Sequence, residues 1–209
     1  MTVAALYVET NGVYFGLPDV DPWDEARDAR LYAGPWPVVT HPPCARWCQL
    51  ASVNEKRWGA KIGDDGGCFA AALWAVERFG GVLEHPAYSL AWSEYCLPRP
   101  GRNGWTANID RPGWSTEVSQ VAYGHPARKR TWLYYVGPNP RKLDWRDLTG
   151  ARVVGAGVNS GQSAGRGRLT KREVLASPLA FRDALLSLAR GCALQDVPAV
   201  AVGRGDETA

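Results

Sequence analysis

Residues 36–48 read WPVVTHPPCARWC, and this stretch decides the fold that the sequence predicts. The β-branched run 37–40 predicts a short strand, and the stiff corner His41-Pro42-Pro43 ends it. Open α/β folds place their chemistry at strand ends that are followed by rigid turns. Cys44 comes directly after this corner and is therefore a candidate nucleophile. The alternative is that Cys44 is a small buried hydrophobic residue.

A second stretch repeats this design further along the chain. Residues 68–81, CFAAALWAVERFGG, have apolar side chains at helical spacing and end in two glycines, which predicts a helix and its stop. Residues 82–84 then predict a short strand that ends at Glu84, before His85-Pro86. Two strands joined by a helix favour a crossover with parallel strands. We therefore expect Cys44 and Glu84 at the same edge of one sheet; the alternative role for Glu84 is a cap or salt bridge at a strand end.

The other segments predict a small α/β protein. We expect strands at 4–8, 13–17, 117–123 and 131–136, a short helix at 24–32, an exposed loop at 49–62 that could close over a substrate, an irregular segment at 97–114, a capping box at Thr170–Glu173, and a helix from Ser177-Pro178 to Gly191. By domain, we expect an α/β catalytic-like core at 1–150, a glycine-rich basic loop and a C-terminal helix that packs on the core at 151–195, and a disordered tail at 196–209.

Composition narrows the function classes. The chain has 209 residues, a net charge of +3, ten tryptophans and five cysteines. No stretch approaches the roughly 18 apolar residues of a membrane helix, so we expect no membrane partner. The irregularly spaced cysteines form no disulfide framework, so we expect a cytoplasmic protein. Basic residues cluster at 127–130 and 165–172. With so many aromatic rings, these clusters favour a nucleic-acid or nucleotide partner, although packing and solvation are the alternatives.

Four short motifs follow one another between residues 36 and 137. They are Pro43-Cys44 after a strand, 64–69 (DDGGCF) at a helix start, Glu84-His85-Pro86 after a second strand, and Tyr123-Gly124 followed by Arg128-Lys129-Arg130 before a third. In this order they resemble the catalytic core of the DNA cytosine-5 methyltransferases. The resemblance implies a reduced, Rossmann-like, methyltransferase-type sheet with flanking helices in a single domain. The small size is similar to that of methyltransferase-like proteins encoded by bacteriophages, which act in the host cytoplasm.

The resemblance also implies a chemistry. Cys44 would add as a thiolate to C6 of cytosine, and C5 would then accept a methyl group from S-adenosylmethionine. Glu84 would hydrogen-bond the base near N3 and the exocyclic amine, while Arg128 and Arg130 would bind the ring oxygen, a phosphate or Glu84. A base in duplex DNA would have to be flipped out. Further substrate contacts are implied for Pro43, Arg46, His85, Tyr123 and Lys129.

The chain departs from the family pattern, and other functions stay open. Residues 6–16 lack the family's Phe-x-Gly-x-Gly cofactor loop, Ala45 and His85 replace its usual glutamine and asparagine, and no large target-recognition domain is present. Pro42-Pro43-Cys44 with Gln49 also resembles the thymidylate synthases, which implies pyrimidine C5 modification of a base or nucleotide without S-adenosylmethionine. Another alternative is an inactive nucleic-acid-binding or anti-defence module. Zinc is a weaker alternative, because a single Cys-x-x-x-Cys pair is not typical of a zinc site. Its ligands would come from Cys44, Cys48, Cys68, Cys96, His41, His85 and His125.

Overall fold

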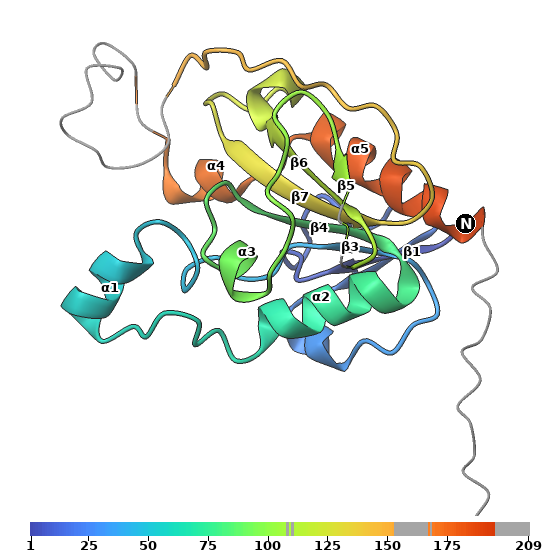
Figure 1. Ribbon diagram of the computed structural model, residues 1–209, viewed down its shortest axis with the longest axis horizontal. Helices are drawn as coiled ribbons and strands as arrows, with labels where there is room; N and C mark the ends of the chain where they lie inside the picture. The colour runs from blue at the N-terminus through green and yellow to red at the C-terminus, as the bar shows by residue number, and fades with distance from the viewer. Residues whose placement is uncertain (108, 110, 153–166, 168, 195–209) are drawn as a thin grey trace, which may run out of the picture.

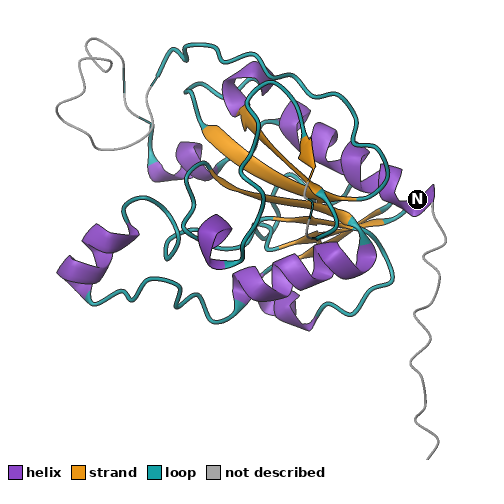
Figure 2. Cartoon of the chain, viewed as in Figure 1, coloured by secondary structure: helices purple, strands orange, loops and turns teal. Residues whose placement is uncertain are grey.

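The computed structural model shows one domain, a seven-stranded mixed sheet with helices on both faces (Figures 1 and 2). The structure describes residues 1–107, 109, 111–152, 167 and 169–194. The strands are β1 (Val3–Leu6), β2 (Val20–Trp23), β3 (Val38–Thr40), β4 (Gly81–Pro86), β5 (Thr106–Ala107), β6 (Trp114–Ser119) and β7 (Arg130–Val136). Their order is β2-β1-β3-β4-β7-β6-β5. The first four are parallel neighbours, and β7 runs antiparallel to both β4 and β6.

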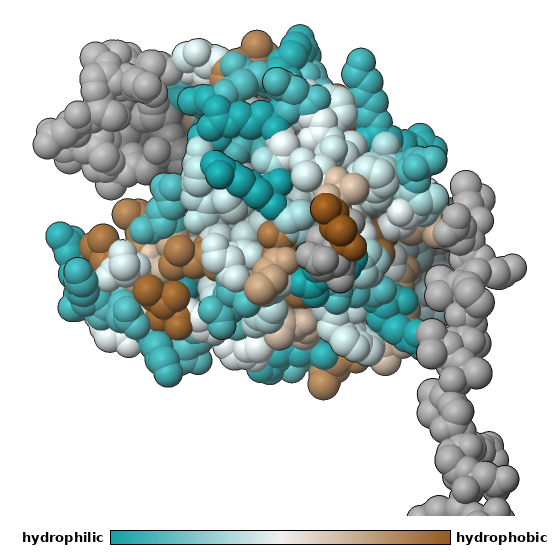
Figure 3. Space-filling view, in the orientation of Figure 1, coloured by the Kyte–Doolittle hydropathy of each residue, from teal (hydrophilic) through white to brown (hydrophobic). Residues whose placement is uncertain are grey.

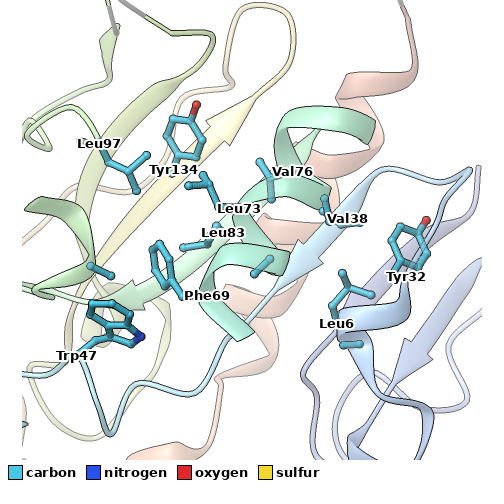
Figure 4. Close-up of a cluster of buried hydrophobic side chains, with 14 of the residues drawn as sticks. Leu6, Tyr32, Val38, Trp47, Phe69, Leu73, Val76, Leu83, Leu97 and Tyr134 are labelled. Carbon is cyan, nitrogen blue, oxygen red and sulfur yellow. The ribbon is translucent and has the colours of Figure 1, made fainter. Parts of the chain in front are cut away.

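The helices cover both faces of the sheet. They are α1 (Ala51–Trp58), α2 (Cys68–Phe79), α3 (Ala91–Glu94), α4 (Lys171–Leu175) and α5 (Leu179–Arg190), with 3-10 turns η1 (Glu25–Arg27), η2 (Ala29–Leu31), η3 (Gln120–Tyr123) and η5 (Gly191–Leu194). Figure 1 shows α2 on one face and α5 on the other. On the α2 face, Phe69, Leu73 and Val76 pack on Val38 and Leu83 (Figure 4). These two buried faces form the core of the domain.

The predicted unit of strand, helix and strand is confirmed. β3 pairs in parallel with β4, with Val39 opposite Val82, and α2 connects them. Gly81 makes this pairing possible, because its φ is +125° and a Cβ there would lie 2.0 Å from the Val38 carbonyl oxygen. The carboxyl ends of both strands therefore lie at one edge, and Cys44 and Glu84 share it, as the sequence predicts.

Two expectations near the N-terminus are wrong. Residues 13–16 form turns instead of a strand, because the amides of Gly12 and Phe15 donate to the carbonyls three residues earlier rather than to a neighbouring strand, and Tyr14 packs with the core on the α5 face. The second strand is instead β2, which pairs in parallel with β1. Residues 24–32 form the two 3-10 turns η1 and η2 rather than one helix, and Asp28 between them has a left-handed φ of +46°.

The segment 49–62 was expected to be a loop, but it contains α1. Only Ala51 of this helix is buried, so the sequence has no apolar face that could reveal a period. Gly59 ends the helix with a φ of +63° and donates its amide to the Glu55 carbonyl. Leu50 and Val53 are exposed here. On the face shown in Figure 3, hydrophobic residues are scattered among hydrophilic ones.

The C-terminal helix starts are confirmed. Thr170 and Glu173 form the predicted capping box of α4, and α5 begins after Pro178 and packs on the core, followed by η5 at Gly191. The strand predicted at 131–136 is β7, whereas β6 starts earlier than predicted and 120–123 are the turn η3. The irregular segment 97–114 contains the short strand β5. Most of the glycine-rich loop and the tail at 196–209 lie outside the described residues. No helix in the described part of the chain is long and apolar enough to span a membrane.

Candidate functional site

The site lies at the carboxyl edge of the parallel strands. β1 has β2 on one side and β3 on the other, so the strand order reverses between β1 and β3. In open α/β sheets the crevice at such a switch point binds ligands. The turn after β3 meets the end of β4 here. The start of β7 and the end of β6 reach the same edge, because β7 runs in the opposite direction.

Glu84 is the central side chain of this edge. Its Oε2 lies 2.9 Å from His41 Nδ1, and its Oε1 accepts a hydrogen bond of 3.3 Å from Gln120 Nε2. The Gln120 amide also donates to Thr131 Oγ1, which fixes its direction. Burial opposes ionisation of Glu84, but the hydrogen bond from His41 and the positive charge of Lys129 favour it, and the pKa of the carboxyl lies below its ordinary value.

His41 joins Glu84 to a buried tyrosine. The Tyr14 hydroxyl lies 2.9 Å from His41 Nε2, and the two rings are 5.5 Å apart. Burial is the main reason that the pKa of Tyr14 is raised, so the phenol keeps its proton. The side chains of His41 and Glu84 remain 16% and 12% exposed, so a ligand can reach the pair. Tyr14 and Gln120 were not expected in the site, and His41 was considered only as a zinc ligand.

Cys44 lies at the start of a tight turn beside this pair. The amides of Trp47 and Cys48 donate to the Cys44 carbonyl at 3.0 and 2.9 Å, which holds the thiol at the strand end. Burial raises the pKa of the Cys44 thiol, the charges of Glu84 and Cys48 raise it further, and the Lys129 charge lowers it. Cys44 therefore rests as a thiol whose acidity depends on the charges around it.

The predicted helix-start motif at 64–69 connects the nucleophile segment to α2. Asp65 accepts hydrogen bonds from Trp47 Nε1 at 2.8 Å and from the amides of Gly67 and Phe69 at 3.0 and 2.8 Å. The carboxylate thus caps α2 and fixes Trp47, three residues after Cys44. A cavity of about 490 Å³ opens beside Trp47, lined also by residues 61–64, Glu94 and Tyr95.

The three cations of the turn before β7 separate to two sides. Arg128 pairs with Asp147, and Arg130 pairs with Glu117 at 2.5 Å and lies over the Tyr88 ring. Neither of these pairs includes Glu84, one of the three partners, with the ring oxygen and a phosphate, that the resemblance implied for the two arginines. Lys129 is the cation whose charge acts on both Glu84 and Cys44. The reason is that successive side chains of an extended segment point to opposite sides.

His85 was expected to contact the substrate, but the structure places it in the core. Its side chain is 1% exposed, its Nδ1 lies 2.7 Å from Ser89 Oγ, and its ring packs edge-on against Phe69. Burial lowers the pKa of His85 to about 4. His85 therefore supports the backbone of β4 from the face opposite Glu84.

Tyr123 also has structural contacts, because its ring packs on Phe181 of α5 and its hydroxyl accepts the Asp144 amide at 2.8 Å. Pro43 is exposed and Arg46 is partly buried, and both flank Cys44 in the chain. Of the predicted substrate contacts, Pro43 and Arg46 are thus close neighbours of Cys44 in the chain, and Lys129 is the one whose charge acts on Cys44 and Glu84.

In the described part of the chain, no group of three or more His, Cys, Asp or Glu side chains is placed to hold a metal ion. The cysteines and histidines proposed as alternative zinc ligands are not gathered there. Comparison of the chain with known protein families, with curated proteins and with solved structures found no match.

Proposed function

We propose that this protein activates C5 of cytosine in DNA by covalent addition of Cys44 to C6. The observation that carries the proposal is the meeting of Cys44 and Glu84 at one sheet edge, with the Lys129 charge acting on both. The strand order β2-β1-β3-β4 supports a Rossmann-like arrangement of the parallel half of the sheet, with a switch point between β1 and β3. The ordered motifs around Cys44, Glu84 and Lys129 support cytosine as the base.

The proposed step balances within the site. The Cys44 sulfur loses its proton and bonds to C6, the electrons of the C5=C6 bond shift through C4 to N3, and N3 gains a proton. C5 becomes an enamine-like carbon that takes up a proton from water, and loss of the original C5 proton with release of Cys44 returns cytosine. Glu84 accepts hydrogen bonds from N3–H and from the exocyclic amine. Because the Glu84 charge raises the pKa of Cys44, donors of a bound base that screen this charge also make the thiol more acidic.

DNA is the proposed partner, and a cytosine in DNA would have to be flipped out of the base stack to reach this edge. The thiol, Glu84 and His41 are only partly accessible, so the base has to enter as a single extruded ring. Lys129, whose charge acts on Cys44 and Glu84, and the partly buried Arg46, two residues after Cys44, would supply positive charge for the phosphates of such a strand.

S-adenosylmethionine is not part of this proposal, because residues 6–16 lack the Phe-x-Gly-x-Gly loop that holds it in the family that the sequence resembles. Tyr7 follows β1 and packs on the α2 face, while Tyr14 is buried on the α5 face and hydrogen-bonds His41. Both residues follow β1 in the chain, on the side where a doubly wound sheet holds its cofactor, and both side chains pack into the core instead. The proposed activation of C5 requires only residues of this chain.

The proposal is tested by exchange of the cytosine C5 proton in heavy water. Addition of Cys44 makes C5 basic, so C5 takes up a deuteron, and reversal returns cytosine labelled at C5. Purified protein is incubated with duplex DNA, with single-stranded DNA or with free deoxycytidine monophosphate, and deuterium is measured by mass spectrometry of the nucleosides. We expect exchange in DNA with the wild type and none above background with Cys44→Ser.

The matched control is Cys96→Ser, because Cys96 is exposed and its thiol donates a long hydrogen bond of 4.0 Å to the Ser93 carbonyl. We expect this variant to exchange at the wild-type rate. Exchange of the free nucleotide alone would replace DNA by nucleotide as the substrate. A wild type no faster than Cys44→Ser on all three substrates would refute the proposal.

A further inference from the structure

The hydrogen bonds of His41 determine where its proton lies. The Glu84 carboxylate can only accept hydrogen bonds, and it lies 2.9 Å from His41 Nδ1, so Nδ1 must carry a proton. The Tyr14 hydroxyl, 2.9 Å from Nε2, is buried and keeps its own proton. The structure gives this hydroxyl a hydrogen bond with His41, so the Tyr14 O–H has an acceptor when Nε2 carries no proton. The neutral ring with its proton on Nδ1 is the form that fits both neighbours.

This arrangement defines what Glu84 offers to a base. A carboxylate has about four lone-pair sites, and His41 and Gln120 occupy one on each oxygen. The remaining sites can only accept. Lys129 adds a positive charge close to the carboxylate, and the buried, neutral His85 occupies the opposite face of β4. The carboxylate is therefore held as a pure acceptor at the partly exposed edge.

We propose that Tyr14 and His41 form a positioning unit which fixes Glu84 as a pure hydrogen-bond acceptor and thereby selects cytosine over uracil and thymine. This inference rests on the proposed function. Cytosine presents an amine donor at position 4, whereas uracil and thymine present an oxygen acceptor there. The sulfur adduct of cytosine has donors at both N3 and N4, so Glu84 matches the adduct better than the free base. An acceptor-only carboxylate repels O4 of the other two bases.

The spectroscopic test reads the proton on His41 directly and does not need substrate. The chain has three histidines, so ¹⁵N spectra of the imidazoles are simple, and His85→Asn and His125→Asn assign the other two. We expect His41 to carry its proton on Nδ1 in the wild type. Tyr14→Phe removes the hydrogen bond to Nε2, so His41 should no longer be held in the single form that carries its proton on Nδ1. The control Tyr32→Phe removes a buried hydroxyl that bonds the Trp36 carbonyl at 2.6 Å and should leave His41 unchanged.

The functional test compares C5 exchange in cytosine and in uracil placed at the same position of one oligonucleotide. His41→Leu removes a hydrogen bond to a charged group, so we expect cytosine exchange to fall about tenfold or more and the preference over uracil to shrink. His41→Asn keeps an N–H donor near the Nδ1 position and should restore most of the preference. If His41→Leu fails to fold, His41→Asn and Tyr14→Phe still test the inference.

The outcomes separate the two proposals. If the wild type exchanges neither base while the ¹⁵N spectra show the expected His41 form, the proposed function fails and the positioning geometry stands alone without a selective role. If the wild type exchanges cytosine but His41 carries its proton on Nε2, the positioning unit is refuted and C5 activation survives. The same holds if the cytosine preference is unchanged in His41→Leu.

Discussion

At the scale of single residues, the acidity of Cys44 depends on which neighbours face it. Burial raises the pKa of the thiol, the Glu84 charge raises it further, and the Lys129 charge lowers it. Arg128 directly precedes Lys129 in the sequence but pairs with Asp147. Neighbouring side chains of an extended segment point to opposite sides, so the charge of Lys129 acts on Cys44 while that of Arg128 does not.

We predict opposite effects of the two charges on the Cys44 thiol. Glu84→Gln should lower the pKa of Cys44, and Lys129→Met should raise it, because each removes one of the two opposing charges. The pH dependence of iodoacetamide alkylation measures this pKa, and peptide mass spectrometry separates Cys44 from the other cysteines. Arg128→Met is the matched control. An equal shift in Arg128→Met and Lys129→Met would contradict the placement of Lys129.

The buried ring of His85 predicts loss of stability in acid. Burial lowers its pKa in the folded state from 6.5 to about 4. Between these values the unfolded chain binds a proton that the folded chain does not, so stability falls as pH decreases from about 6.5 to 4, by about 3 kcal/mol in total. Urea unfolding at several pH values measures this loss. His85→Asn should be less stable at pH 7, since it loses ring packing, but should show a shallower slope; an unchanged slope would assign the loss to other groups.

At the scale of elements, the unit β3, α2 and β4 could be predicted because its signals are local. The helical period at 68–79, two glycines and two short apolar runs determine it. α1 could not be predicted, because a helix that buries only Ala51 has no apolar stripe. The turns at 13–16 could not be predicted either, because Tyr14 in this segment is buried and hydrogen-bonds His41, a partner 27 residues away.

The pairing of β3 with β4 predicts a strict requirement for glycine at 81. A Cβ there would meet the Val38 carbonyl oxygen at 2.0 Å, so Gly81→Ala must push the two strands apart or fail to fold. The control is Gly16→Ala, which shares a positive φ of +72° but has open space around the added Cβ. We expect it to cost only the backbone strain of about 1 kcal/mol. Thermal unfolding compares the two, and an equal loss in both would contradict the close approach.

At the scale of the whole molecule, the site joins segments that lie far apart in the chain. Tyr14, His41, Glu84 and Gln120 come from four segments, and the sequence separations of the bonded pairs are 27, 43 and 36 residues. Sequence reasoning placed Cys44 and Glu84 together, because parallel pairing follows from local patterns. It could not place Tyr14 or Gln120, since neither stands in a motif and only the fold brings them to this edge.

The register of β7 explains why Lys129, rather than Arg128 or Arg130, is the cation whose charge acts on Cys44 and Glu84. β7 enters the sheet antiparallel to β4, with Thr131 opposite Pro86 and Leu133 opposite Glu84. This register places Lys129, Thr131 and Leu133 toward one face and Arg130 and Trp132 toward the other. The sequence predicts that successive side chains of β7 alternate between the two faces, but it does not predict the pairing register of β7 with β4.

The exchange of a single cytosine proton tests the central claim most directly. An oligonucleotide with one cytosine is incubated in heavy water with wild-type protein or Cys44→Ser, and the H6 signal of that cytosine is followed by proton NMR. We predict that the H6 doublet collapses to a singlet with the wild type, because deuterium replaces H5, and stays a doublet with Cys44→Ser. A doublet that persists with both proteins, in duplex and in single-stranded DNA, would contradict the assignment of Cys44 as the nucleophile that activates C5.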